Sequence, residues 1–189
     1  SLKAIGSRNY ENEASAQTAL AALRSQSRLK VESVAKQVAH ISPPLLYDLT
    51  ALQKEANRRH GFSADKTLSI AQSLYEKKIT TYPRTGSRYI SEDVFEEVPV
   101  LLRKIGMPLS NPLNRHSVDN AKITDHHAII PTGETPTGLS TDEANIYNMV
   151  VTRFSEAFSS DSEEERMQVR FTDGTNTFTW KACRQISLG

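Results

Sequence analysis

"LTALQKEANRRHGFSADKTLSIAQSLYEKK", residues 49–78, predicts two consecutive helices separated by a glycine turn. Thr50 is a candidate N-cap for the first helix, which we expect to run to about Arg59 and to end at Gly61. Ser63 is a candidate N-cap for the second helix. The apolar side chains of this second helix share one face: Leu68, Ala71, Leu74 and Tyr75. The pair is typical of a helix-turn-helix, an arrangement that also occurs in many all-helical domains.

Basic residues are concentrated in and just after this helix pair. Between Thr50 and Ile90 the acidic residues are Glu55, Asp65 and Glu76, whereas the basic ones are Lys54, Arg58, Arg59, Lys66, Lys77, Lys78, Arg84 and Arg88. The stretches "SEDVFEE" and "DSEEE" compensate this excess, so the formal net charge is only +1. A basic face on a neutral chain suits a module that binds a phosphate backbone, but charge alone favours a solvated helix face.

The segments before the helix pair are less regular. Residues 12–25 are rich in Ala and Leu and predict a helix. Residues 28–41 fit a helical period, but their valines also suit a strand. Pro43 and Pro44 then require an extended chain because proline lacks a backbone donor and fixes its own φ.

Two further helices and a hairpin are predicted after the helix pair. Ser91 begins a helix that ends near Gly106, with an apolar stripe of Val94, Val98, Leu101, Leu102 and Ile105. Ser140 and Glu143 form a capping box for another helix. Apolar and polar residues alternate on both sides of Asp173-Gly174, which predicts a β-hairpin.

The composition of the 189 residues, 38% hydrophobic and 24% charged, is typical of soluble globular proteins with one large domain or two small ones. No apolar run approaches the length of a membrane span. The single cysteine, Cys183, excludes an internal disulfide and fits a reducing compartment. The first residues contain no initiating Met and no apolar signal core, so we expect a piece of a longer protein.

"TTYPRTGSRYI", residues 80–90, contains the residues with the clearest chemistry. Pro83 favours an extended chain, so we expect Tyr82 and Arg84 to point to the same side, with Cα atoms roughly 7 Å apart. A phosphate fits between a phenol and a guanidinium, whose planar fork suits phosphate. A phenol, with a pKa of about 10, attacks a phosphodiester only where cations stabilise the phosphoryl oxygens. From these residues alone, a half-buried aromatic in a turn beside a surface arginine is the commoner arrangement.

Residues 46–91, from "LYDLT" to "GSRYIS", closely resemble the active-site region of the type IA DNA topoisomerases, in particular their topoisomerase III branch. "TDHHAIIPTG", residues 124–133, resembles the second motif of that family, and "EANIYNMVVTRFSEAF", residues 143–158, resembles the helix that follows it. The resemblance covers most of the chain from about Val31 onward. It identifies the chain as a central fragment that carries the active-site tyrosine of such an enzyme.

The resemblance implies an α+β fold that is mainly helical. A helical domain of helix-turn-helix or winged-helix type is expected to be inserted into part of a β-rich hinge domain. Residues 1–45 would form the first part of the hinge domain, residues 46–160 the helical domain with the tyrosine, and residues 161–189 the returning β-hairpin of the hinge domain.

The resemblance also implies an activity and three residue roles. Tyr82 matches the nucleophile that becomes joined to a DNA 5′ phosphate, Arg84 matches the arginine that stabilises the scissile phosphate, and His126 matches the histidine that contacts DNA nearby. The implied activity is transient cleavage of one DNA strand, strand passage and religation without ATP, since exchanging one phosphodiester for another keeps the bond energy. We expect further DNA contacts from Lys54, Arg58, Arg59, Thr85, Ser87, Arg88 and His127.

The chain differs from the family pattern in two ways. Gly86 stands where the family usually has Asp, so no role of that carboxylate carries over. The Mg²⁺ of the family is held by acidic residues of a separate Toprim domain, and no matching acidic motif occurs here. We therefore expect Mg²⁺ in the full-length enzyme, no metal ligand in this chain, and no activity of the fragment alone.

Partners and location follow from the same resemblance. The expected partners are single-stranded DNA, the remaining Toprim and gate domains, and a helicase. We expect a monomer in the bacterial cytoplasm that associates with the nucleoid and not with a membrane.

Three other interpretations start from the same residues. Asp125, His126 and His127 suggest a metal site, but three adjacent side chains rarely converge on one ion. "DHH" also occurs in a class of phosphoesterases, whose additional aspartate motifs the chain lacks. The main alternative is a non-catalytic helix-turn-helix module that places residues 50–78 in the major groove. Such a module prefers specific duplex sequences, whereas a topoisomerase fragment prefers single strands.

Overall fold

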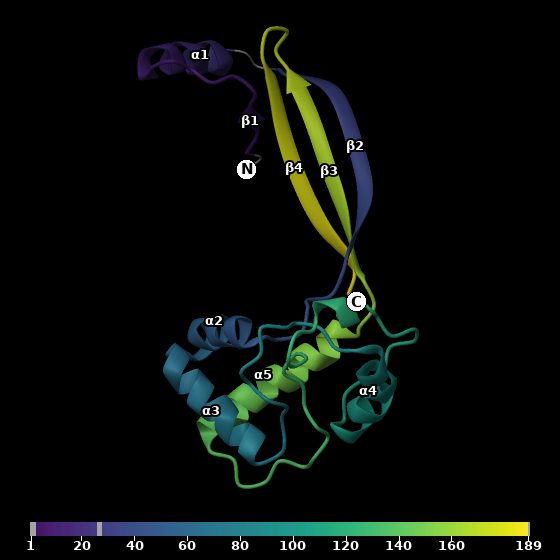
Figure 1. Ribbon diagram of the computed structural model, residues 1–189. Coiled ribbons are helices and arrows are strands. Elements are labelled where there is room, and N and C mark those ends of the chain that lie inside the picture. The colour runs from purple at the N-terminus through teal and green to yellow at the C-terminus, as the bar shows by residue number, and fades with distance from the viewer. Residues whose placement is uncertain (1–2, 26–27, 189) are drawn as a thin grey trace. The chain divides into compact units, whose positions relative to one another are not determined.

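The computed structural model describes residues 3–25 and 28–188. Residues 1–2, 26–27 and 189, which belong to the predicted hinge segments, lie outside the described residues. The described chain divides into two units (Figure 1). The sheet unit contains the described residues up to Ile41 together with Ser162–Leu188, and the helical unit contains Ser42–Asp161.

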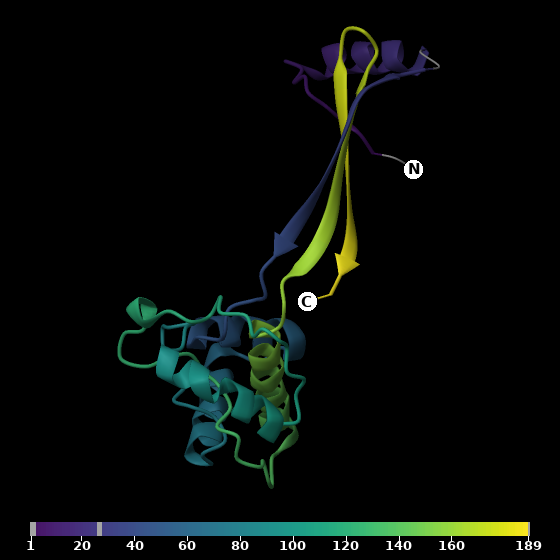
Figure 2. The ribbon, with the colours of Figure 1, turned by 90° about the vertical axis from the view of Figure 1, so that its right-hand side faces the viewer.

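The described strands of the sheet unit form one antiparallel sheet in the order β1-β4-β3-β2. They are β1 (Ile5–Gly6), β2 (Lys30–Ile41), β3 (Ser162–Thr172) and β4 (Thr177–Ser187). Figure 2 shows β2, β3 and β4 running alongside one another. Most of segment 28–41 is therefore a strand, because its valines pair with β3. The helix predicted at residues 12–25 is confirmed as α1 (Glu13–Ser25).

The predicted hairpin joins β3 to β4 and is confirmed. The Asp173 carboxylate accepts the N–H groups of Thr175 at 2.8 Å and Asn176 at 2.6 Å. Gly174 adopts a φ of 96°, a left-handed value that side chains disfavour. The turn is therefore specified locally, by the two residues from which it was predicted.

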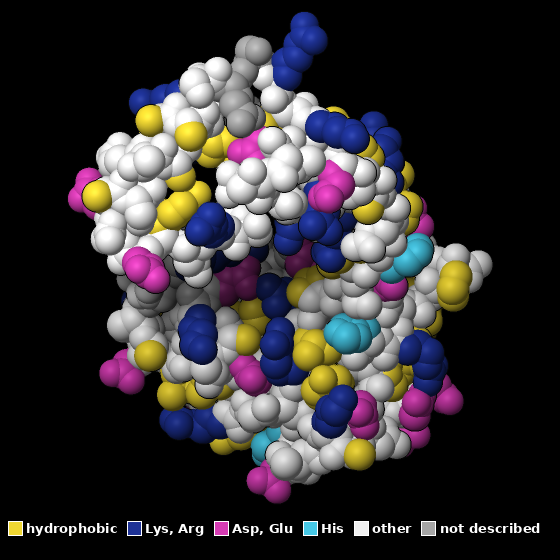
Figure 3. Space-filling view, turned by 90° about the horizontal axis from the view of Figure 1, so that it is seen from above, with side chains coloured by type: hydrophobic (Ala, Val, Ile, Leu, Met, Phe, Trp, Pro, Cys, Tyr) yellow, Lys and Arg dark blue, Asp and Glu magenta, His cyan; other side chains and the backbone are white. Residues whose placement is uncertain are grey.

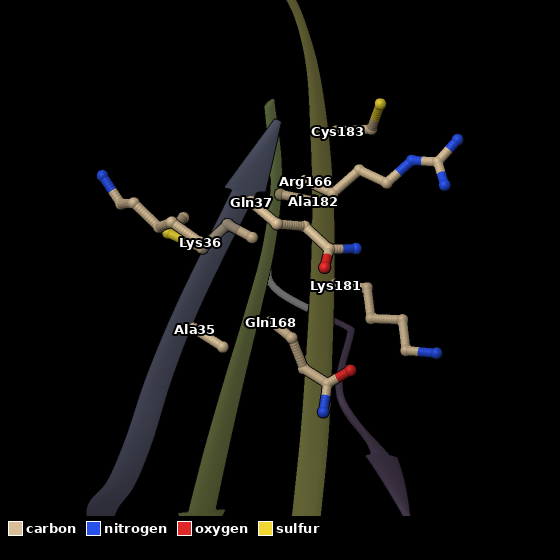
Figure 4. A pocket seen from close by; sticks show the side chains of 9 residues that line it. Ala35, Lys36, Gln37, Arg166, Gln168, Lys181, Ala182 and Cys183 are labelled. Carbon is tan, nitrogen blue, oxygen red and sulfur yellow. The ribbon is translucent and has the colours of Figure 1, made fainter. Parts of the chain in front are cut away.

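The two faces of the sheet differ in polarity because side chains alternate along each strand. On one face Val34, Val169 and Trp180 are in register, and Val169 is the only buried side chain among the described residues of the strands. The other face is polar and carries a hollow with a volume of about 570 Å³. Figure 4 shows the side chains around this hollow, which include Gln37, Arg166, Gln168 and Lys181.

Residues 42–161, all of which are described, contain four α-helices and one 3-10 turn: α2 (Leu49–His60), α3 (Ala64–Glu76), α4 (Glu92–Lys104), η1 (Asn120–Lys122) and α5 (Thr141–Ala157). The predicted N-caps Ser63 and Ser91 are confirmed. Ser140 and Glu143 form the predicted capping box of α5. Gly61 ends α2 with a φ of 69°.

In the helix pair the predicted N-cap is wrong, and the predicted apolar face of α3 is right for Ala71 and Leu74 only. The N-cap of α2 is Asp48 rather than Thr50, since the Asp48 carboxylate accepts the Ala51 N–H at 2.6 Å. Just before this cap, Tyr47 forms a bridge with Ile129 of a distant segment, so the chain there pairs as a strand and not as a helix. The buried face of α3 consists of Thr67, Ala71 and Leu74, whereas Tyr75 is 40% exposed and Leu68 is only partly buried.

Helix α5 lies at the centre of the helical unit, as Figure 1 shows. Its first half, including Ile146 and Val150, packs in one apolar cluster with residues of α2 and α3. Its last turns, including Phe154, pack in a second cluster with residues of α4. The chain is thus α+β, as predicted. No helix in the described ranges combines the length and apolar character needed to cross a bilayer.

Candidate active site

The Tyr82 loop (residues 80–90) lies against the His126 loop (residues 124–133), although the two are far apart in the sequence. Two backbone hydrogen bonds join them: Thr81 N–H to the Ile130 carbonyl at 2.9 Å, and Ala128 N–H to the Tyr89 carbonyl at 2.9 Å. The Thr81 hydroxyl adds a bond to the Ala128 carbonyl at 3.2 Å. Both ends of the Tyr82 loop are therefore held by the His126 loop.

Tyr82 packs between two other aromatic side chains. Its ring centroid lies 4.7 Å from that of His126 and 5.3 Å from that of Tyr75, which is on α3. The Tyr75 ring meets Tyr82 edge-on, at an interplanar angle of 75°. Tyr82 itself is only partly buried. The structure thus brings together Tyr82 and His126, and the partial exposure of Tyr82 lets a ligand approach the pair.

Arg84 has different neighbours from Tyr82. The backbone bends at Pro83, which is buried, so the expectation of an extended Tyr82-Pro83-Arg84 segment is wrong. Arg84 lines a polar hollow of about 470 Å³ along α3, whereas Tyr82 lines another of about 460 Å³. Glu76, in the last turn of α3, borders both hollows. Thr81 and Thr85, which flank the three residues of this bend, are both hydrogen-bonded to the His126 loop, and these bonds fix the two ends of the bend.

Three of the residues expected at DNA form hydrogen bonds inside the protein. The buried Thr85 hydroxyl donates to the His126 carbonyl at 2.9 Å, and the buried Ser87 hydroxyl donates to the Lys122 carbonyl at 2.9 Å. Arg88 is partly buried, and its guanidinium donates to backbone carbonyls. These side chains shape the Tyr82 loop, because the two hydroxyls and two donors of the Arg88 guanidinium bond to carbonyls of the protein.

The remaining residues expected at DNA lie outside the Tyr82 loop. On α2, Lys54, Arg58 and Arg59 are exposed, and both arginines pair with Glu55. His127 donates from Nδ1 to the Ala128 carbonyl at 2.7 Å, so its ring is tied to its own segment. Lys54 forms no ion pair within the described ranges and is the freest of these cations.

Glu55, the partner of both arginines, also belongs to a partly buried ionic cluster with Arg153 and Tyr47. Arg153 of α5 donates to Glu55 at 2.5 Å and stacks over the Tyr47 ring at 4.2 Å. Burial raises the pKa of the Tyr47 phenol. Burial also works to raise the pKa of Glu55, but a hydrogen bond from Tyr47 and the charges of Arg153 and Arg59 lower it overall. The cluster therefore keeps Glu55 ionised and Tyr47 neutral.

Sequence reasoning missed the residues that border the Tyr82 ring and the Arg84 hollow. Tyr75 was expected on the apolar face of α3, yet it contacts Tyr82. Glu76 was counted only among the acidic residues between Thr50 and Ile90. Both residues belong to the last turn of α3, which leads directly into the Tyr82 loop, and this closeness was the available signal.

The described residues contain no group of three His, Cys, Asp or Glu side chains able to hold a metal ion. The adjacent Asp125, His126 and His127 accordingly form no such site in the described chain. On the face seen in Figure 3, Lys and Arg side chains are interspersed with Asp and Glu side chains. The site therefore consists of Tyr82 and His126, whose rings are in contact, and of Arg84, which lines a neighbouring hollow. The described residues add no group of metal ligands to it.

Comparison with known proteins gives consistent results. A sequence model described as DNA topoisomerase matches residues 2–189. "DNA topoisomerase 3" of Shouchella clausii is 38% identical over 180 residues, which is 87% of this chain and 25% of that protein. "DNA topoisomerase 3" of Bacillus cereus is 42% identical over 170 residues, or 82% of this chain and 23% of that protein.

A solved structure is also similar. The full-length topoisomerase I from Thermotoga maritima superposes with a TM-score of 0.74 and 27% identity, covering 98% of this chain and 32% of that one. The chain spans about a quarter of the length of the curated relatives it matches.

Proposed function

This chain belongs to the DNA topoisomerase family, and we propose that it carries the strand-cleaving tyrosine of a type IA enzyme of the topoisomerase III kind. The observation that carries the proposal is the contact between the Tyr82 and His126 rings, 4.7 Å apart, in a site built from two separate motifs. A phenol beside an imidazole, with an arginine two residues along the chain, supplies a nucleophile, a polar partner and a phosphate-binding cation.

In the proposed reaction, the Tyr82 oxygen attacks a phosphorus of a single DNA strand. The bond from phosphorus to the 3′ oxygen breaks as the bond from phosphorus to the tyrosine oxygen forms, and the phenol proton is matched by the proton that the leaving 3′ oxygen takes up. Arg84 binds the phosphoryl oxygens as charge accumulates, and His126 contacts the DNA beside them. Attack by the 3′ hydroxyl on the phosphotyrosine reverses the step, so no ATP is needed.

Metal ions enter this proposal only through other parts of the enzyme. Because the described residues offer no acidic cluster for Mg²⁺, we assign that ion to a domain outside this chain and derive no step from it. The isolated chain is therefore expected to cleave no DNA, whatever Mg²⁺ is supplied.

Domain roles and partners are part of the same proposal. Residues 1–45 and 161–189 would belong to a hinge domain and residues 46–160 to the domain that presents the tyrosine; the division of the chain into two units supports this assignment. The partners would be single-stranded DNA, the Toprim and gate domains of the full-length enzyme, and a helicase. The enzyme would act as a monomer in the bacterial cytoplasm, at the nucleoid.

The decisive experiment replaces Tyr82 by Phe in the full-length enzyme. A single strand labelled at its 3′ end becomes covalently attached to the wild-type protein after cleavage, because the tyrosine holds the 5′ phosphate of the downstream piece. Tyr82→Phe should form no adduct and relax no supercoiled plasmid, while binding the strand as before, since only the nucleophilic oxygen is lost. Tyr10→Phe, in the sheet unit, is the matched control and should behave as wild type. Relaxation by Tyr82→Phe would disprove the assignment.

The observed α2–α3 pair also keeps a second function open, a non-catalytic helix-turn-helix module. Such a module would bind a duplex more tightly than its single strands and would tolerate Tyr82→Phe. A comparison of the affinities of the full-length protein for a strand and for its duplex separates the two functions. Preference for the single strand, with an affinity that falls steeply in salt, supports the topoisomerase.

A further inference from the structure

The lead-in segment (residues 45–49) runs from Pro43-Pro44 into the first residue of helix α2. Two of its backbone carbonyls accept hydrogen bonds from arginine side chains. Arg88 donates from Nε to the Leu46 carbonyl at 3.0 Å and from Nη2 to the Leu45 carbonyl at 3.3 Å. Arg153 donates from Nη1 to the same Leu45 carbonyl at 3.2 Å. Two guanidiniums thus converge on the Leu45 carbonyl, which lies outside the helices and strands of the described chain.

The two arginines come from different parts of the helical unit. Arg153 belongs to α5, and its charge is compensated by Glu55 at 2.5 Å. Arg88 belongs to the Tyr82 loop and has no carboxylate partner in the described part of the chain. Its bonds to the Leu45 and Leu46 carbonyls are therefore its only assigned interactions, and they are of the stronger, charge-assisted kind.

These bonds complete a frame around the loop that presents Tyr82. The Leu49 N–H donates to the Thr85 carbonyl at 3.1 Å, so the lead-in segment also touches the loop through its backbone. The Ile129 N–H donates to the Tyr47 carbonyl at 2.8 Å, so the same segment is bonded to the His126 loop. Arg88 is the side chain that ties the Tyr82 loop to a segment already fixed against the loop of His126.

We propose that Arg88 is a positioning residue, which acts on the reaction by fixing the Tyr82 loop so that Tyr82 keeps its place beside His126. This inference rests on the proposed function. It also replaces the expectation that Arg88 binds DNA, because two of its donors face the protein's own carbonyls. A lysine keeps the charge but cannot span two carbonyls from one planar group, so charge alone does not substitute for the fork.

The test uses Arg88→Lys and Arg88→Gln in the full-length enzyme, at a temperature where circular dichroism shows both to be folded. In single-turnover cleavage at saturating single-stranded DNA, both variants should be about 10- to 100-fold slower, since small displacements of a reacting group have effects of this size. The Kd for the strand and its salt dependence should stay unchanged. Arg115→Lys is the matched control, because this exposed arginine pairs with Glu92 and makes no bond to the Tyr82 loop.

Two outcomes would overturn the proposal. If Arg88→Lys cleaves at the wild-type rate while both variants only melt at a lower temperature, Arg88 is merely structural. If both the affinity and the salt slope fall, the slope by about one, Arg88 contacts a DNA phosphate. The proposed function is tested separately, because Tyr82→Phe must abolish cleavage whatever Arg88 does.

Discussion

The helical unit and the sheet unit bury their side chains to very different extents. In the helical unit α5 joins two apolar clusters, and residues such as Leu46, Leu74 and Phe154 are fully buried. In the sheet unit the described strands bury only Val169, and Val34 and Val38 stay more than half exposed. Packing around a common helix can hold side chains from distant segments in one place, whereas an open sheet is held mainly by strand pairing. The candidate site accordingly lies in the unit with the dense core.

The largest expected difference between the units is the loss of stability when an apolar side chain is replaced by alanine. Phe154→Ala removes a fully buried ring shared by α5 and its neighbours, and should lower the free energy of unfolding by about 3–5 kcal/mol. Val34→Ala, in the half-exposed apolar face of the sheet, is the control and should change it by at most about 0.5 kcal/mol. Urea unfolding of both variants measures the contrast. Equal losses of stability in the two variants would contradict the difference in packing between the two units.

The partly buried ionic cluster of Glu55 and Arg153 provides the next largest effect. Arg153→Met removes the least exposed of the three arginines that pair with Glu55. It should cost about 2–3 kcal/mol, near the lower end for a buried pair, because Arg58 and Arg59 still pair with Glu55 and both Glu55 and Arg153 keep some exposure. Adding Glu55→Gln should cost less in the Arg153→Met background than in the wild type, because the ion pair between Glu55 and Arg153 is already absent there. Urea unfolding of the single and double variants forms the required cycle. A double variant less stable than the sum of the single losses would contradict the pairing.

A smaller effect is expected at the contact between α3 and α5. Hydrogen bonds from Lys77, Ser73 and the Ser140 N–H lower the pKa of Glu143 from 4.5 to about 2. Because the folded pKa lies below the unfolded one, this contribution to stability is complete above about pH 4.5 and is lost as the pH falls toward 2. Glu143→Gln should therefore differ most from wild type at pH 6 and least at pH 2, in urea unfolding. Glu97→Gln, on the exposed face of α4, should show no such trend.

The smallest expected change in stability is at Gly86 of the helical unit, where a side chain would meet no neighbouring atom. Gly86 is exposed, has a φ outside the left-handed range, and a Cβ added there would meet nothing within 4 Å. Gly86→Ala should therefore raise the free energy of unfolding by about 0.4–1 kcal/mol, through the lower entropy of the unfolded chain. Gly61→Ala, equally free of contacts but at a φ of +69°, should instead lower it by roughly 1 kcal/mol. A loss of stability at Gly86 would mean that the loop is tighter than this open position indicates.

Local signals in the sequence predicted much of the secondary structure correctly. The caps Ser63, Ser91 and Ser140 and the turn at Asp173-Gly174 depend on hydrogen bonds that span three or fewer residues, so their residue types suffice. Segment 28–41 stayed ambiguous because its strand conformation depends on pairing with β3, more than a hundred residues later. Thr50 was expected as the N-cap of α2, whereas the structure has Asp48 there, although the bond from the Ala51 N–H to Asp48 also spans only three residues.

The sequence selected Tyr82, Arg84 and His126 as candidates through the resemblance of residues 46–91 and 124–133 to the topoisomerase motifs, since the residue chemistry alone left the role of Tyr82 and Arg84 open. The tertiary structure decided how they meet: Tyr82 contacts His126 and Tyr75, Arg84 turns to another hollow at the Pro83 bend, and Arg88 holds two carbonyls. The physical reason is the distance along the sequence over which the stabilising contacts act. A cap or a turn is stabilised within a few residues, whereas the site is stabilised by hydrogen bonds and packing between loops that only the helical core brings together.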